Sequence, residues 1–461
     1  MNAMDNDFLF DEESEDAVRR YEQSVNDRRM PYFDVEELEA IADYYLSYGQ
    51  TKESSKVIEL GLKLHPNNTA LQRKRAKVYL LSGEAQKAYQ IVERNFPLDD
   101  AESLMLKGEA LMQLHRTKEA SLIFQHLIRL PDIDIESTYL DIAYIYIASG
   151  DYSSALSYLE QGVAIDNKSL DLLQETAICC EQLQKIEKAI DYYQRMISID
   201  PYFTEAWYNL GLVYFGQAAY EKALDAFDFV TIIDDKDAGG WLQKGNTFFH
   251  LNQYNEALTC YSQCEKLTVY EGILYVFMGE CLEKMEKYDE AKIYYNKSLE
   301  INNQDVEGWI GLGICALETE DYETAATHFQ KALDIEPNNS EALVYLAETQ
   351  INTNKSEEAL MSYRKSLVLE PNQPETWLSM GNVYVDLGLY EQAVVTYQRA
   401  LSQDDSLENI YLFLAIAEYK SGHISSAMEF LDKARESNPE ANMLFLELCP
   451  EATSLLEDHQ K

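Results

Sequence analysis

The sequence predicts an all-α chain, built as a solenoid of antiparallel helix pairs, and three observations lead to this prediction. Small residues recur every 34 residues, as Gly381, Gly313, Gly279 and Gly245 do. A second series of alanines, which includes Ala393, recurs at the same spacing. Only 10 prolines and 19 glycines occur among 461 residues, of which 46% are hydrophobic. This composition leaves little room for long linkers and allows a continuous core.

Each unit of 34 residues is predicted to contain two amphipathic helices, and residues 374–407 show the pattern most clearly. Trp377, Gly381 and Tyr384 fall on one face of a first helix, because they are spaced three and four residues apart. Gly388 interrupts that helix near its end. The unit therefore turns back on itself after about half its length.

The second helix of this unit carries Ala393, Tyr397 and Ala400 on one face. Small residues allow the two helix backbones to approach closely, and the aromatic rings fill the space on either side. The pattern W-x2-M-G-x2-Y followed by A-x3-Y-x2-A resembles the tetratricopeptide repeat, in its 34-residue period and in its residue types. The resemblance implies a right-handed superhelix whose first helices line a concave groove.

Twelve copies of the unit follow one another, and together they cover residues 35–441. They are expected to form one solenoid, in which each repeat buries its apolar face against its neighbours. Residues 442–461 are expected to form a C-terminal capping helix. Phe445, Leu448 and Cys449 occupy the positions of a thirteenth first helix, Pro450 breaks or kinks it, and Leu455 and Leu456 are placed to cover the end of repeat 12. The repeats begin near residues 35, 69, 101, 136, 170, 204, 238, 272, 306, 340, 374 and 408.

Residues 1–34 form an acidic N-terminal arm that precedes the repeats. Acidic residues surround the apolar triplet Phe8–Phe10, and Ser14–Asp27 is compatible with a helix that has Ala17 and Tyr21 on one side. Such a segment is commonly a solvated tail. The alternative is that Asp11–Asp16 folds back onto a basic patch in repeat 2 and places the triplet in the groove.

The charge balance bears on the class of partner. Lys and Arg total 38 against 80 Asp and Glu, a formal net charge of −42. We therefore expect no nucleic acid partner and no anionic membrane partner. The excess charge either keeps a long solenoid soluble or attracts a basic protein segment. The first residues show neither a basic region nor an apolar run of signal-peptide length, so we expect a cytoplasmic protein.

No catalytic, cofactor or metal site is predicted. The chain contains no GxxxxGK[ST], HExxH or GxSxG motif, and its 7 histidines are scattered through different repeats. Cys179, Cys281 and Cys315 recur near the small position of their repeats and are expected to be packing residues. Cys260 and Cys264 are four residues apart, but two thiolates alone do not make a structural zinc site.

In the family that the chain resembles, positions 2, 5, 9, 12 and 13 of the first helix commonly contact a ligand. Position 5 is apolar through repeats 6–12, and position 12 is apolar in the same repeats except repeat 8; we call these apolar residues the apolar lane. The lane either binds a partner segment or packs against the next first helix. It consists of Tyr208, Phe215, Leu242, Phe249, Val276, Ile310, Leu317, Val344, Ile351, Leu378, Val385, Leu412 and Tyr419.

Repeat 2 departs from the acidic average, because Arg73 and Lys77 at positions 5 and 9 form a basic patch that is expected to face the groove. The Lys/Asn clamp by which chaperone adaptors of the family hold a C-terminal carboxylate is absent, since the next repeat has Leu106 and Glu109 at the required positions. The sequence thus predicts a non-catalytic scaffold that binds a basic or apolar protein or peptide segment in its concave groove. The alternatives are a structural or assembly subunit of a larger complex and a repeat module that serves an enzyme encoded elsewhere.

Overall fold

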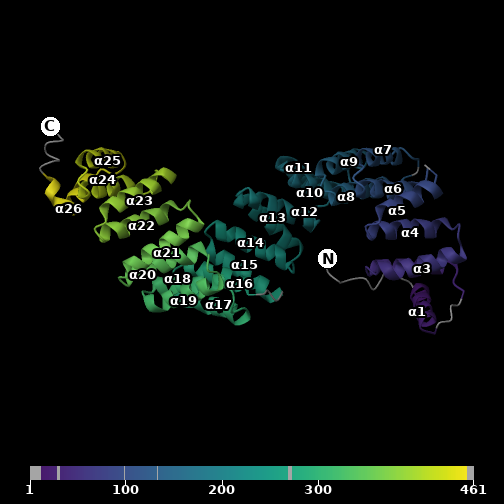
Figure 1. Cartoon of the computed structure of the whole chain (residues 1–461), viewed down its shortest axis with the longest axis horizontal. Helices are drawn as coiled ribbons and strands as arrows, with labels where there is room; N and C mark the ends of the chain where they lie inside the picture. The colour runs from purple at the N-terminus through teal and green to yellow at the C-terminus, as the bar shows by residue number, and fades with distance from the viewer. Residues whose placement is uncertain (1–11, 28–31, 98, 132, 268–271, 454–461) are drawn as a thin grey trace. The chain divides into compact units, whose positions relative to one another are not determined.

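A computed structural model describes residues 12–27, 32–97, 99–131, 133–267 and 272–453 of the chain (Figure 1). Within these residues the protein is entirely helical, with 26 α-helices, one 3-10 helix and no strand. The predicted all-α fold is therefore confirmed.

The chain divides into two compact units, residues 1–217 and residues 218–461. Helix α12 lies in the first unit and α13 in the second. Within each unit, first and second helices pack as antiparallel neighbours and each pair packs on the next. The single solenoid expected over residues 35–441 stays a prediction.

Every first helix begins within two residues of the predicted start of its repeat. Side-chain caps explain several of these starts: the carboxylate of Asp134, for example, accepts a hydrogen bond of 3.0 Å from the backbone N–H of Ser137. The first helices are α2 (Val35–Ser47), α4 (Thr69–Leu81), α6 (Ala101–Gln113), α8 (Ile135–Ala148), α10 (Leu170–Gln182), α12 (Thr204–Gly216), α14 (Ala238–His250), α16 (Ile273–Lys284), α18 (Val306–Glu318), α20 (Ser340–Asn352), α22 (Pro374–Asp386) and α24 (Ile410–Lys420).

The second helices are 14 residues long, except α5 and α7, which have 11 residues each. Helices α5 and α7 belong to repeats 2 and 3, whose lengths differ from the usual 34 residues. The second helices are α3 (Thr51–Leu64), α5 (Ala85–Asn95), α7 (Thr117–Leu127), α9 (Tyr152–Ile165), α11 (Ile186–Ile199), α13 (Tyr220–Ile233), α15 (Tyr254–Leu267), α17 (Tyr288–Ile301), α19 (Tyr322–Ile335), α21 (Ser356–Leu369), α23 (Tyr390–Gln403) and α25 (Ile424–Ser437).

The turn between the two helices of a repeat contains a residue with left-handed backbone. Gly388 has φ 70°, as the glycine at the predicted turn requires. In other repeats a residue with a side chain takes the same conformation, for example Glu320 with φ 59°. The turn is therefore a constant feature of the fold, although glycine marks it in the sequence only in some repeats.

The predicted close approach of the two helices is present. In repeat 9, Gly313 of α18 lies against the ring of Phe329 of α19, and a Cβ atom at position 313 would clash with that ring. In repeat 11, Gly381 and Tyr397 stand in the same relation. Ala325 and Ala393 are fully buried. The small residues thus make room for an aromatic side chain of the second helix. These aromatic side chains form a large part of the core.

At the N-terminal end, α1 (Glu12–Asp27) packs on α2 and α3. Ala17, Tyr21 and Ser24 are buried, as the predicted helix required. Their spacing matches that of Ala393, Tyr397 and Ala400, so α1 takes the place of a second helix before the first repeat. It covers the apolar face that repeat 1 would otherwise expose.

Among the described acidic side chains of α1, Glu15 and Asp16 pair within the helix and not with the basic patch. Asp16 pairs with Arg20, and Arg73 pairs with Asp100 of the next repeat, so these two residues give no support to the alternative in which Asp11–Asp16 folds back onto the basic patch. The reason is local: acidic and basic residues four apart in α1 meet on one helix face. The triplet Phe8–Phe10 lies outside the described residues.

At the C-terminal end, α26 (Ala441–Leu448) packs on α24 and α25 and is followed by a 3-10 helix, η1 (Pro450–Ala452). Phe445 and Cys449 are fully buried against the last repeat, whereas Leu448 is 57% exposed. Pro450 ends the α-helix, as predicted. Residues 454–461 lie outside the described residues.

Candidate functional site

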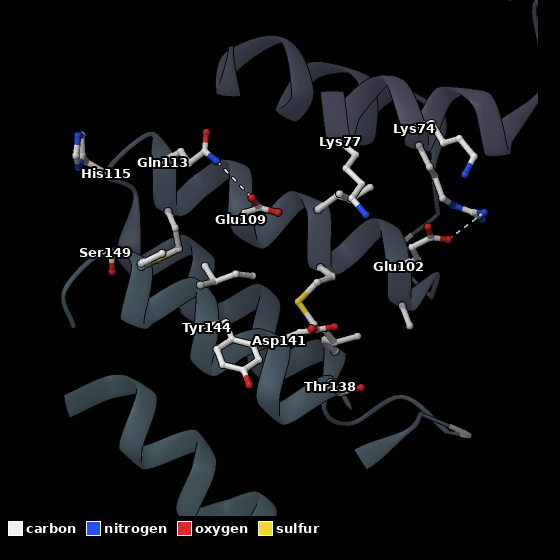
Figure 2. Close-up of a pocket in the computed structure, with 18 of the residues that line it drawn as sticks. Lys74, Lys77, Glu102, Glu109, Gln113, His115, Thr138, Asp141, Tyr144 and Ser149 are labelled. Carbon is white, nitrogen blue, oxygen red and sulfur yellow. Dashed lines mark hydrogen bonds and ion pairs between the residues drawn. The ribbon is translucent and has the colours of Figure 1, made fainter. Parts of the chain in front are cut away.

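The first unit contains a hollow of about 860 Å³ on the first helices α2, α4, α6 and α8 (Figure 2). We call it the N-terminal hollow. Its side chains come from one face of each helix: Glu102, Met105, Glu109 and Met112 of α6 follow one another at three or four residues. The residues that line it include Asp43, Arg73, Lys74, Lys77, Glu102, Met105, Leu106, Glu109, Met112, Gln113, Asp141, Tyr144 and Ala148.

One wall of the N-terminal hollow is apolar. Met105 is half-buried, and Leu106 and Met112, which also line the hollow, are buried. Methionine side chains are flexible and polarizable, so they adapt to apolar groups of different shape. This wall is suited to hold an apolar side chain of a partner.

Two of the three cations at the hollow are already neutralised. The Arg73 guanidinium lies 3.2 Å from the Asp100 carboxylate and 3.3 Å from that of Glu102. The Lys74 ammonium lies 2.6 Å from the Asp43 carboxylate. Lys77, in contrast, makes no hydrogen bond or ion pair with any residue that the structure describes. Arg73 and Lys77 both line the hollow, but only Lys77 offers a charge that is unpaired among the described residues, and their place in a concave groove stays a prediction.

Two carboxylates lie across the hollow from Lys77. Burial raises the pKa of Glu109, and the charge of Lys77 and a hydrogen bond of 3.4 Å from Gln113 Nε2 oppose this rise. The pKa of Asp141 is also raised, because its carboxyl group is partly removed from water, and Lys77 again acts in the opposite direction. Lys77 therefore influences both carboxylates without pairing with either.

The sequence pattern did not single out Met105, Glu109, Met112 or Asp141. The first three occupy positions 5, 9 and 12 of repeat 3, and positions 5 and 12 are those by which the apolar lane was defined in repeats 6–12. These three residues are partly apolar and partly charged, so they do not form a uniformly apolar or uniformly basic pattern in the sequence. Asp141 lies at position 6 of repeat 4 and belongs neither to the apolar lane nor to the basic patch, so its place in the hollow is known only from the structure.

The apolar lane divides into two groups. Val276, Ile310 and Leu412 are 1%, 2% and 4% exposed and belong to hydrophobic core clusters, so they pack within the fold. The other lane residues are half-buried, and a role for them in binding stays a prediction. They are Tyr208, Phe215, Leu242, Phe249, Leu317, Val344, Ile351, Leu378, Val385 and Tyr419.

In the second unit, the first helices α16, α18 and α20 bring several carboxylates together. The pKa of Glu280 is raised to about 7, first by burial and then by the charges of Glu283 and Glu307. Burial also raises the pKa of Glu307 and Glu341, and each is further raised by neighbouring carboxylates. The charged forms of these carboxyl groups are therefore disfavoured in the folded chain, and their effect on stability depends on pH.

The cysteines pack as predicted, since all seven are buried and none is in a disulfide. The Cys264 thiol donates a hydrogen bond of 3.3 Å to the carbonyl oxygen of Ala238.

Within the described residues, no helix has both the length and the apolar character that crossing a membrane requires.

Family models match the chain in five segments. The model of the middle TPR-like domain of cilia and flagella-associated protein 70 matches residues 275–403. Models described as TPR repeat or tetratricopeptide repeat match residues 136–169, 181–217, 238–268 and 384–444. No curated protein is similar enough to match the sequence.

Solved structures also resemble the chain. The APC/C hetero-tetramer Cut9–Hcn1 is 14% identical with a TM-score of 0.43, over 87% of this chain and 98% of that one. YrrB, a TPR protein with an unusual peptide-binding site, is 21% identical with a TM-score of 0.32, over 39% and 92%. The MamA protein is 18% identical with a TM-score of 0.34, over 38% and 94%.

The sequence, the helices and the family models identify the same family. The helix pairs begin where the 34-residue register predicts. The family models agree with this register, since they match residues 275–403 and four further segments. The chain is therefore a tetratricopeptide repeat protein.

Proposed function

We propose that the chain is a non-catalytic scaffold that binds a segment of a partner protein in the N-terminal hollow. The observation that carries this proposal is the composition of the hollow: an apolar wall around Met105 lies next to charged groups, Lys77 and Asp141, that have no partner among the described residues. Exposed apolar surface bordered by polar groups is typical of interaction sites.

The fold supports this role because tetratricopeptide solenoids present side chains of successive first helices on one extended surface. Residues from α4, α6 and α8 contribute to the same hollow although they are far apart in sequence. A partner segment laid across these helices would contact several repeats at once. Its affinity would then depend on the spacing of the repeats. This spacing is set by the packing of each small residue against an aromatic ring.

A steric block tests the proposal. Ala148 is exposed and lines the hollow, whereas Ala164 is exposed on the second helix α9 and does not line it. In affinity capture from cells, followed by mass spectrometry, Ala148→Trp is expected to lose a stoichiometric partner that the wild-type chain and Ala164→Trp retain. Circular dichroism establishes that both variants keep their helical content. Capture of the same partner by all three proteins would refute a role for the hollow.

A further inference from the structure

The charged groups in the N-terminal hollow indicate which kind of partner segment fits there. Figure 2 shows the Lys77 ammonium group pointing from α4 into the hollow, with Glu109 on α6 and Asp141 on α8. Asp141 makes no hydrogen bond or ion pair with any described residue, and Glu109 has only the long hydrogen bond from Gln113. Three charges in the hollow are therefore incompletely satisfied.

The sum of these charges is negative. Arg73 and Lys74 are neutralised by Asp100, Glu102 and Asp43, so they add no free positive charge. What remains is one cation, Lys77, against the carboxylates of Glu109 and Asp141. Next to them, Tyr144 donates a hydrogen bond of 3.1 Å to Glu175, a further carboxylate whose pKa is raised by burial. A cation from a partner would complete this arrangement.

Helical spacing places apolar surface on both sides of Glu109. Met105 lies four residues before Glu109 and Met112 three residues after it, so all three share one face of α6. A partner side chain that reaches Glu109 thus brings its own neighbours onto the two methionines. The hollow matches a cationic residue that stands between apolar ones.

We propose that the N-terminal hollow binds a partner segment in which a lysine or arginine lies between apolar residues, with the cation held by Glu109 and Asp141 and the apolar side chains on Met105 and Met112. This rests on the proposed function, since it specifies the partner of the same site. Lys77 is then a resident cation whose charge acts on both carboxylates in the free chain and competes with the cation of the partner.

An acidic segment fits less well. It would gain the attraction of Lys77 but would be repelled by Glu109 and Asp141, and the chain as a whole carries a formal charge of −42. The two kinds of partner make opposite predictions for Lys77. Removing this cation strengthens the binding of a basic segment and weakens the binding of an acidic one.

The test begins with selection of random peptides by display on the full chain. Peptides that bind in the hollow are those retained by the wild type and by Ala164→Trp but lost by Ala148→Trp. We expect lysine or arginine next to apolar residues to be enriched among them. The enriched peptides are then synthesised with a fluorescent label, and their dissociation constants are measured by anisotropy.

Charge variants of the full chain decide the assignment. Asp141→Asn is expected to weaken binding about fivefold, and Lys77→Met to strengthen it about threefold, as is typical of partly exposed charge pairs. Glu187→Gln and Lys118→Met make the same changes of charge at exposed positions on the second helices α11 and α7, outside the hollow. These controls are expected to leave binding unchanged, which separates the hollow from general attraction to an acidic chain.

The outcomes distinguish the two proposals. If no peptide distinguishes Ala148→Trp from Ala164→Trp, the hollow is not a binding site and both proposals fall. If hollow-dependent peptides are found but are acidic, or if Lys77→Met weakens their binding, the proposed function stands and the basic partner is wrong. Equal effects of Asp141→Asn and Glu187→Gln would also overturn the assignment of the carboxylates.

Discussion

Ile310 and Leu378 occupy position 5 of their repeats, but their surroundings differ. Ile310 is 2% exposed within the core cluster of repeats 9 and 10, whereas Leu378 is half-buried at the edge of the cluster of repeats 10–12. The same position therefore serves packing in one repeat and leaves part of the side chain accessible in another. A binding role for the apolar lane is open only to residues of the second kind.

Replacement by serine separates the two roles. Ile310→Ser is expected to lower the free energy of unfolding by about 3 kcal/mol, because it leaves a cavity and buries a hydroxyl group. Leu378→Ser is expected to lower it by roughly 1 kcal/mol, since part of the leucine already contacts water. Urea denaturation monitored by circular dichroism measures both values. Leu122→Ser, at a site 64% exposed on α7, serves as control and is expected to change little.

An equal loss of stability in Ile310→Ser and Leu378→Ser would contradict this division of the lane. If Leu378→Ser keeps its fold and loses a bound peptide, the half-buried part of the lane takes part in binding. If it keeps both, Leu378 is a packing residue like Ile310.

At the scale of helices, the carboxylates on α16, α18 and α20 link folding to pH. Glu280 has a pKa of about 7 in the folded chain against an ordinary value of 4.5. Since the folded pKa is raised, the folded chain binds a proton more tightly than the unfolded chain does. Stability is therefore expected to fall as pH rises from about 4.5 through 7, by at most about 3 kcal/mol from this group.

Glu280→Gln tests this expectation, because glutamine stays neutral at every pH. The variant is expected to resemble the wild type near pH 4.5 and to be the more stable protein near pH 8. Glu290→Gln, at an exposed position of α17, is the matched control and is expected to leave the pH profile of stability unchanged. Parallel profiles for the wild type and Glu280→Gln, measured by urea denaturation, would show that Glu280 does not cause the dependence.

At the scale of the whole molecule, each repeat contacts mainly its neighbours, so damage is expected to remain local. Gly313→Leu forces a side chain against the ring of Phe329 and is expected to cost roughly 1–3 kcal/mol. Hydrogen exchange should show lost protection in α17–α20 and little change in α24 and α25. Thr327→Leu adds a leucine at an exposed site on α19 and is the control. Uniform loss of protection throughout residues 218–453 would contradict local coupling.

The sequence alone determined the repeat register and, within two residues, where every first helix begins. Residues such as Gly313 and Ala325 recur at a fixed spacing because each repeat solves the same local packing problem, and that regularity is visible without a structure. The turn residue was predictable only in part. Glycine marks it at Gly388, but Glu320 adopts the same backbone conformation under the constraint of the packed helices on either side.

Only the tertiary structure decided which charges are available for binding. Arg73 and Lys77 are equivalent in the sequence, yet Arg73 is neutralised by Asp100, which lies 27 residues away, and Lys77 is not. Likewise Asp141 has no motif that marks it, and it becomes part of the candidate site because α8 packs beside α6. Pairing and burial of charge depend on contacts between repeats, and these contacts arise from the stacking of helices rather than from the pattern within any one repeat.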